Sequence, residues 1–273
     1  MDLDLTPSPA IDFVSLAESF YAGLIQLDLA QNHTSLALEK LLGGRFLYVG
    51  ELHERGRALV VAGNVAGAAT LAATAVIDAQ MRVVHDGTVD FLVTSLDEAL
   101  RILKNEIRKR ETVAVCLGIA PEAIEGEMLE RGVRPDLLGP LAESVSASRL
   151  FGPGVKRVDM HPASASQALI SWEVNESPAR WMPLLDAIAT GCLPENEMAA
   201  RRWLRLAPRF LGRPAQGIRL LRSDPETARV IAGRMRDAVC GGKIGASVHI
   251  EIAVGDQRTI TALQPPAARE SAG

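Results

Sequence analysis

Residues 58–86 read ALVVAGNVAGAATLAATAVIDAQMRVVHD, and the pattern in this stretch decides the fold that we expect. An apolar run at 58–62 is followed by Gly63 and a segment of small residues, and a second apolar run ends shortly before Asp86. This order predicts a strand, a glycine-containing turn, a helix packed closely on a sheet, and a second strand. Such an arrangement is typical of the first unit of a doubly wound sheet that binds a nucleotide.

The turn of this unit carries the residues that are expected to face a phosphate. Gly63 and Gly67 allow the backbone to come close to a phosphate, and Asn64 and Val65 lie between them. The helix that we expect over 64–75 offers unpaired N–H groups and the positive end of its dipole at the same place. The three-glycine pattern is incomplete, because Val65 stands where a second glycine is favoured. The alternative is therefore an ordinary strand–turn–helix unit without a ligand.

A carboxylate follows the second expected strand, at 81–84. Asp86 lies roughly 20 residues beyond the glycine turn, the spacing at which an acidic side chain binds ribose hydroxyl groups. His85 precedes it and is a second candidate at the mouth of the site. We therefore assign Asp86 to the ribose of a bound nucleotide.

The middle of the chain continues the alternation of strands and helices. Ser95 and Glu98 form a capping box at the start of a helix, and 112–118 is an apolar run typical of a buried strand. This alternation predicts a parallel sheet with helices on both faces. Gly118 and Ala120 then lie at the carboxyl end of a strand, where ligands bind in such sheets.

The expected fold class is α/β, a doubly wound and mostly parallel Rossmann-like sheet with a smaller α+β portion built from the two ends of the chain. We place the Rossmann-like domain at 57–141 and the α+β portion at 1–56 and 142–264. Within that portion, alternating segments on both sides of Gly255 predict a β-hairpin. Residues 265–273 begin with two prolines and are expected to form a disordered tail.

Composition limits the partners that we expect. The chain has 33 acidic and 29 basic residues and a net charge of −4, which argues against a nucleic-acid partner. Its three cysteines, Cys116, Cys192 and Cys240, lack metal-binding spacing, so we expect no metal site and a reducing, cytoplasmic location. No signal-peptide pattern begins the sequence, and no apolar run reaches the ~18 residues of a membrane span.

Two blocks of the sequence resemble the urocanase (urocanate hydratase) family. The first resembles that family's central NAD-binding domain, and the second resembles the segment before its catalytic-cysteine strand. The first block consists of GRALVVAGNVAGAATLAATA at 56–75, SLDEAL at 95–100 and ERGVRPDLL at 130–138; the second consists of LPENE at 193–197, ARRWLRLA at 200–207 and GRPA at 212–215. The blocks follow the family order and cover about half of the chain.

The resemblance implies an unusual use of a cofactor. In urocanases NAD is a bound electrophile whose nicotinamide ring adds to the imidazole of the substrate; water is then added, and there is no net oxidation or reduction. By this resemblance Gly63 and Gly67 face the pyrophosphate of NAD and Asp86 faces its adenosine ribose. Ala120 and its neighbours line the cofactor from the third strand.

The sequence departs from the family at its catalytic residues. The family's cysteine falls at or near Arg219, and the polar stretch that the family carries after its Arg-Pro-Asp strand is nearly absent at 139–144. A guanidinium in an apolar strand requires a partner, which at Arg219 is either an acid or an anionic ligand.

We therefore expect a protein that binds NAD or a related nucleotide, with urocanate hydratase chemistry lost. One alternative is an active hydro-lyase that adds water to urocanate or an imidazole analogue. Another is a non-catalytic partner or structural protein of a full-length family enzyme. The expected partner is a small-molecule ligand, and a homodimer is left open.

Overall fold

The structure, a computed structural model, describes residues 9–29, 41–142, 144–150 and 152–266. The chain divides into two compact units. The first, which we call the parallel-sheet unit, comprises residues 15–162 and 209–213. The second, the antiparallel-sheet unit, comprises 1–14, 163–208 and 214–273. The domain expected at 57–141 lies inside the parallel-sheet unit, which begins earlier and ends later in the chain.

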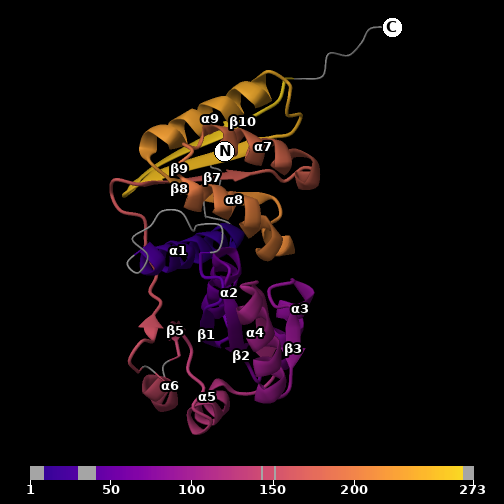
Figure 1. The fold of residues 1–273 in the computed structure, drawn as a ribbon. Helices are drawn as coiled ribbons and strands as arrows, with labels where there is room; N and C mark the ends of the chain where they lie inside the picture. The colour runs from indigo at the N-terminus through magenta and orange to yellow at the C-terminus, as the bar shows by residue number, and fades with distance from the viewer. Residues whose placement is uncertain (1–8, 30–40, 143, 151, 267–273) are drawn as a thin grey trace. The chain divides into compact units, whose positions relative to one another are not determined.

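A parallel sheet of six strands forms the centre of the first unit (Figure 1). Its strand order is β3-β4-β2-β1-β5-β6. The strands are β1 (Phe46–Glu51), β2 (Ala69–Ala73), β3 (Phe91–Val93), β4 (Val113–Leu117), β5 (Leu137–Leu141) and β6 (Lys156–Arg157). Strand β4 is buried along its whole length, as is typical of a strand covered on both faces. The predicted fold class, α/β with a doubly wound and mostly parallel sheet, is confirmed, and the structure adds a separate antiparallel sheet.

Helices connect these strands and supply most of the core. They are α2 (Glu54–Ala66), α3 (Ile77–His85), α4 (Leu96–Lys109), α5 (Pro121–Glu130) and α6 (Val145–Leu150). Helix α4 begins as predicted, because Ser95 is its N-cap and accepts a hydrogen bond from Glu98 N at 3.3 Å. Its buried residues, Leu96, Ala99 and Leu103, follow the helical repeat and join a core cluster with β2 and β4.

The secondary structure predicted for the start of 58–86 is wrong. Residues 58–62 belong to helix α2 rather than to a strand, and Gly67 ends this helix in the left-handed conformation, with φ of 92°. The prediction fails because this part of the helix is buried on every side. From Ala58 to Ala66 all residues of α2 are buried, so the helix has no polar face to give a helical repeat.

The two predictions that follow in the same stretch are also wrong. The segment 64–75, expected as a helix, contains strand β2, whose sequence ATLAA is rich in a residue that favours helices. The segment 81–84, expected as a strand, lies in helix α3. The first strand of the sheet is instead β1, which lies before the quoted stretch.

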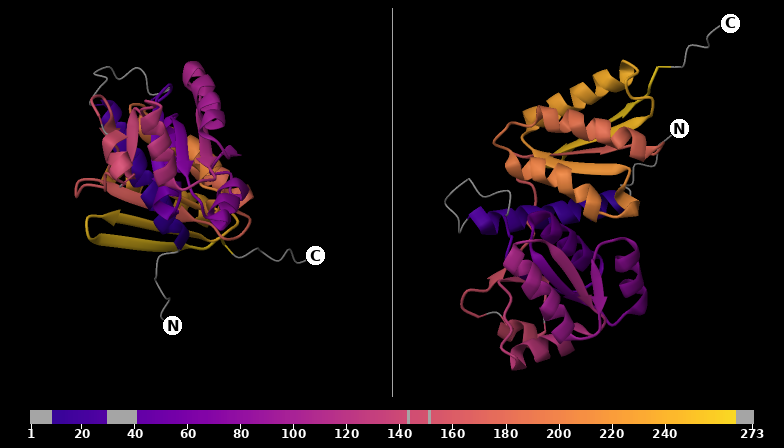
Figure 2. Two further views of the ribbon diagram at one scale, coloured as in Figure 1. Left: turned by 90° about the horizontal axis from the view of Figure 1, so that it is seen from below. Right: turned by 45° about the vertical axis from the view of Figure 1, so that its right-hand side comes forward.

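Four antiparallel strands and their helices make up the second unit (Figure 2). The strands, in the order β10-β9-β7-β8, are β7 (Ala168–Glu173), β8 (Ile218–Ser223), β9 (Val248–Val254) and β10 (Gln257–Leu263). Helices α7 (Pro178–Cys192) and α9 (Pro225–Cys240) pack on each other, and α8 (Met198–Phe210) and a short 3-10 helix (Arg213–Ala215) precede β8. The hairpin predicted around Gly255 is confirmed as β9 and β10. Most of the tail expected at 265–273 lies outside the described residues.

Helix α1 (Pro9–Leu29) is the one helix in the described part of the chain that is long and apolar enough to cross a membrane. The apolar window is Ala10–Leu27, and 44% of it is buried within the protein. Ala17, Phe20 and Leu24 are fully buried in this helix. This burial is typical of a helix in a protein core, which passes the same test of length and composition.

Candidate functional site

The strand order defines where a ligand is expected in the parallel sheet. The chain leaves β1 toward β2 on one side, and it later leaves β4 to form β5 on the other side of β1. In doubly wound sheets ligands bind outside the carboxyl ends of the strands at such a reversal. We call the segments that follow β1, β2 and β4 the carboxyl edge.

The segment after β1 brings two polar side chains to this edge. Glu51 is the last residue of β1 and is half-buried, and its Oε1 accepts a hydrogen bond from Leu52 N at 3.2 Å. His53 is the N-cap of α2, and its Nδ1 accepts from Gly56 N at 3.5 Å. A register shift between Tyr48 and Gly50 interrupts the pairing of β1 with both neighbouring strands, and such a bulge redirects the residues that follow it.

The segments after β2 and β4 lie close together through one glutamine. Gln80, on α3, donates from Nε2 to the carbonyl oxygen of Thr74 at 2.9 Å. A Cβ atom at Gly118 would lie 3.4 Å from the same Nε2, so the Gln80 side chain lies against the end of β4. Ala120 is the N-cap of α5. Gly118 and Ala120 therefore lie at the carboxyl edge, where the sequence predicts them.

Cys116, on β4, lies close enough to this edge for the charge of Glu51 to affect the pKa of its thiol. Burial, with a smaller contribution from the negative charge of Glu51, raises the pKa of the Cys116 thiol to about 12. The thiol is therefore neutral near pH 7 and is a poor nucleophile there. Cys192 and Cys240 are free thiols as well.

The structure places the predicted phosphate turn elsewhere. Gly63, Asn64 and Val65 lie inside α2, and Gly67 is its C-cap, so all four precede the amino end of β2 rather than follow a strand. A Cβ atom at Gly63 would lie 2.9 Å from Leu47 Cδ2. This glycine therefore allows α2 to pack closely on the sheet.

Asn64 and Val65, like Gly63, are buried residues of α2 that contact other parts of the fold. The Asn64 side chain donates from Nδ2 to Thr88 O at 3.2 Å, which links α2 to the segment before β3. Val65 is fully buried. Their assignment to a phosphate depended on a turn from a strand into a helix, whereas residues 63–67 lead from helix α2 into strand β2.

Asp86 is the C-cap of α3, and its carboxylate is already bound. Arg57, on α2, donates from Nη2 to Asp86 Oδ2 at 2.9 Å, and His85 Nδ1 lies 3.7 Å from Asp86 Oδ1. Burial lowers the pKa of Arg57, and the charge of Asp86 opposes this shift. The pair is mostly buried, with 16% of the Arg57 side chain and 15% of the Asp86 side chain exposed.

Arg219 is held by an acid and by backbone carbonyl groups. It lies on β8 and donates from Nε to Asp186 Oδ2 at 3.0 Å. Its Nη1 donates to the carbonyl oxygens of Ala215, Gln216 and Ile218 at 3.4, 3.3 and 2.9 Å. Of the two partners that the sequence leaves open for this guanidinium, the acid is the one that the structure contains.

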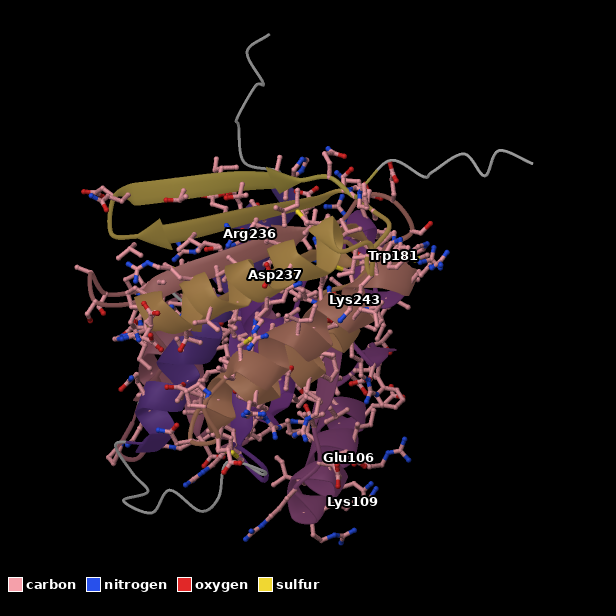
Figure 3. All side chains as sticks on the ribbon, turned by 90° about the horizontal axis from the view of Figure 1, so that it is seen from above. Glu106, Lys109, Trp181, Arg236, Asp237 and Lys243 are labelled. Carbon is pink, nitrogen blue, oxygen red and sulfur yellow. The ribbon has the colours of Figure 1, made fainter. Side chains whose placement is uncertain are left out.

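The structure contains a hollow in each of the two units. A groove of about 940 Å³ runs between α4 and the amino ends of β3 and β4, and basic residues of α4 line it together with Asp90 and Phe91. On the same helix Lys109 donates to Glu106 at 2.8 Å (Figure 3). The other hollow, about 510 Å³, lies between α7 and α9, and Asp237 and Lys243 are among its lining residues. No cluster of three or more metal-binding side chains occurs in the described ranges.

The pyrophosphate of NAD does not fit the turn between β1 and α2. A pyrophosphate binds where glycines and free N–H groups meet it at a helix N-terminus. Here the turn reads Glu51-Leu52-His53-Glu54-Arg55, with a carboxylate at each side of the N-cap, and His53 already accepts from one of the helix N–H groups. Arg55 adds a positive charge, but its guanidinium contacts Met160 Sδ at 4.0 Å.

The sequence analysis assigns no role in the site to Glu51, His53 or Gln80. The available signal was the alternating segment at 46–49, because a charged turn directly after a short apolar strand and before a buried helix marks the carboxyl end of a first strand.

The fold and its carboxyl edge thus define the chain as a doubly wound α/β protein with an acidic turn at the strand reversal. A comparison with models of known protein families finds no match for this chain.

Proposed function

We propose that this protein binds a small molecule through a vicinal diol, as in the ribose of a nucleoside, at the carboxyl edge, and that it lacks urocanate hydratase activity. The observation that carries the proposal is the position of Glu51. This carboxylate ends the central strand beside the strand reversal and is partly buried. Carboxylates at strand ends of such sheets accept hydrogen bonds from ribose hydroxyl groups.

The chemistry of the same turn favours a nucleoside over a dinucleotide. Glu51 and Glu54 disfavour a pyrophosphate, whereas the Glu51 carboxylate and the Gln80 amide suit neutral hydroxyl and base groups. NAD therefore remains a candidate only through its nucleoside portions. We also propose a cytoplasmic location, which three free cysteines support.

The loss of catalysis is proposed from Arg219 and Cys116. The position where the resembled family has its cysteine is occupied by a guanidinium that Asp186 and backbone carbonyl groups bind. Cys116, on the strand that ends at the carboxyl edge, is buried, and burial raises the pKa of its thiol to about 12. We expect urocanate to keep its conjugated absorbance when the protein is added at high concentration, and loss of that absorbance at a rate proportional to protein would contradict this part of the proposal.

Calorimetric titration with adenosine and with NAD tests the binding proposal. We expect saturable binding of adenosine and no tighter binding of NAD. Glu51→Gln is expected to weaken adenosine binding by ~10–100-fold, the equivalent of charge-assisted hydrogen bonds worth about 1.5–3 kcal/mol.

Glu111→Gln is the matched control, because it makes the same charge change at an exposed position next to β4's amino end. It is expected to bind adenosine as the unchanged protein does. Absence of adenosine binding would overturn the proposal, as would NAD binding that is tighter than adenosine binding and insensitive to Glu51→Gln.

A further inference from the structure

The groove between α4 and the amino ends of β3 and β4 has a line of cations along it. Arg101, Lys104 and Arg108 all line this groove, and all three are exposed. They are spaced by three and four residues, so they follow one side of α4 over about 10 Å of its length. Like charges at these spacings repel one another, and an anion bound in the groove would relieve that repulsion.

Other parts of the chain do not neutralise these cations. In the described ranges none of the three forms a salt bridge, and Arg108 donates to a neutral acceptor, Asn105 Oδ1, at 3.2 Å. The pKa of Asp97 is lowered mainly by its hydrogen bonds from Arg131 and less by the charge of Lys104. That carboxylate is therefore already bound by another base, and the positive charge along the groove stays unbalanced.

The dipole of α4 does not account for this line of cations. The C-terminal end of a helix favours cations, but the effect is confined to the last turn. Arg108 lies in that turn together with Lys109, whereas Arg101 and Lys104 lie closer to the middle of the helix. An anionic ligand accounts for all three positions.

Two acids also line the groove, and both are bound within the fold. Asp90 Oδ2 accepts from Ala114 N at 2.8 Å, which joins the segment before β3 to β4. Glu106 Oε1 accepts from Lys109 Nζ at 2.8 Å and from Asn105 Nδ2 at 2.7 Å. The groove therefore offers an incoming ligand an excess of basic side chains.

We propose that this groove binds a small molecule that carries several linked phosphate groups. A guanidinium group binds two phosphate oxygens through parallel hydrogen bonds, and a line of cations suits a chain of phosphates better than a single anion. The groove volume, about 940 Å³, lies within the range of small-molecule sites. The net charge of −4 disfavours a nucleic acid, which binds to a broader basic surface.

Phe91 adds an aromatic ring to the same groove. It is the first residue of β3, and it is 48% exposed. An exposed ring beside a phosphate site suits stacking of a flat organic group, such as the base of a nucleoside triphosphate. The phosphate chain thus has two sources to separate by experiment, an inorganic polyphosphate and a nucleotide.

Calorimetric titration with sodium tripolyphosphate, without divalent cations, tests the proposal. We expect saturable binding that weakens as the salt concentration rises, because salt screens exposed charges. Arg101→Gln, Lys104→Gln and Arg108→Gln should each weaken binding by about tenfold, the effect of losing a charge-assisted hydrogen bond. Arg236→Gln makes the same charge change on α9, in the other unit, and should bind as the unchanged protein does (Figure 3).

Glu106→Gln gives a test in the opposite direction. It removes an acid from the groove and releases Lys109, so tripolyphosphate should bind about threefold more tightly. A variant that has only lost structure cannot gain affinity, so this result separates a role in binding from a role in folding. Weaker binding by this variant, with its fold confirmed by circular dichroism, would contradict the proposal.

ATP compared with tripolyphosphate identifies the source of the phosphate chain. Both titrations use the Glu51→Gln variant, in which binding of the nucleoside at the carboxyl edge is weakened. Tighter binding of ATP that Phe91→Ala reduces to the level of tripolyphosphate would indicate a nucleotide. Equal binding of the two would indicate an inorganic polyphosphate.

Absence of tripolyphosphate binding at low salt would overturn the proposal, as would binding that all three substitutions of the cations leave unchanged. Tighter binding of an oligoglutamate peptide than of tripolyphosphate would overturn it as well and would indicate an acidic protein partner. The ligand proposed for the carboxyl edge is tested with adenosine and Glu51→Gln, so either proposal can fail without the other.

Discussion

At the scale of single residues, the ion pair of Arg219 and Asp186 is the best-defined buried electrostatic feature of the antiparallel-sheet unit. The Arg219 side chain is 10% exposed and that of Asp186 is 19% exposed. Burial raises the pKa of Asp186, and the charge of Arg219 opposes that rise. The Trp172 side chain lowers the Asp186 pKa less than Arg219 does, so Arg219 supplies most of the compensation for this buried charge.

Replacing Arg219 by Met is expected to destabilise the protein by about 3–5 kcal/mol near pH 7, because an uncompensated carboxylate remains buried. The sign of the pH dependence follows from the direction of the pKa. A carboxyl group whose pKa is higher in the folded state than in the unfolded state binds its proton more readily when folded. Its contribution to stability therefore falls as the pH rises from about 3.9, the unfolded pKa, through the folded pKa.

In the Arg219→Met variant the pKa of Asp186 in the folded state is raised further, because the charge of Arg219 no longer opposes the effect of burial. The variant should therefore recover part of its lost stability when the pH is lowered from about 7 to about 5. Urea unfolding at both pH values measures this recovery. The double variant Arg219→Met/Asp186→Leu removes both charges and should be much less destabilised than the single variant. Equal destabilisation of the single and double variants at both pH values would show that the pair has no electrostatic coupling.

At the scale of elements, a short hydrogen-bond network fixes helices α5 and α6 to the central strand. Glu125, on α5, is buried and accepts from Tyr48 OH at 2.9 Å and from the Ser144 hydroxyl. Ser144 also caps α6, because its Oγ accepts from Ala147 N at 2.9 Å. One hydroxyl group thus joins a buried carboxylate to the start of a six-residue helix.

Ser144→Ala is expected to cost about 1–3 kcal/mol, since it removes the cap and leaves one oxygen of buried Glu125 without a donor. Hydrogen exchange should show faster exchange across α6, while β4 stays protected. Ser148→Ala is the matched control, because it removes the same group from the same helix but breaks only an exposed bond to Ser144 O. If both variants exchanged equally fast in α6, the network would have no special role.

Elements were predictable where one face is polar or where a cap is present. The Ser95–Glu98 capping box predicts helix α4, and the alternation on both sides of Gly255 predicts β9 and β10. Helix α2 and strand β2 were assigned the wrong way round. Periodicity cannot distinguish a helix that is buried on all sides from a strand, and a strand made mostly of alanine has the composition of a helix.

The candidate site was predictable only in part for the same reason. Gly118 and Ala120 were placed at the carboxyl edge because strand β4 was assigned correctly. The sequence pattern also predicts Gly63 and Asp86 at this edge, because it predicts strands where the structure has helices α2 and α3. When a helix is predicted as a strand and the next strand as a helix, the turn between them is assigned to the opposite edge of the parallel sheet. The expected site was therefore placed at 63–67 instead of at 51–56.

At the scale of the whole molecule, each unit has a sheet and a buried core of its own. The chain passes between the units within α1 and α8 and in the segments near 162 and 213. Cooperative unfolding follows shared cores more closely than sequence order. We therefore expect a substitution inside one core to lower protection against hydrogen exchange in that unit more than in the other.

Gly139→Ala and Arg219→Met provide the comparison. A Cβ atom at Gly139, on β5, would lie 2.7 Å from Val49 O, so β1 and β5 would have to separate, at a cost of about 1–3 kcal/mol or more. Exchange should then rise in β1, β4 and β5, whereas Arg219→Met should raise it in β7 and β8. Gly126→Ala, in α5 with no atom within 4 Å of the added Cβ, should instead stabilise by about 0.5–1 kcal/mol. If either destabilising variant raised exchange equally in both sheets, the two units would unfold as a single cooperative core.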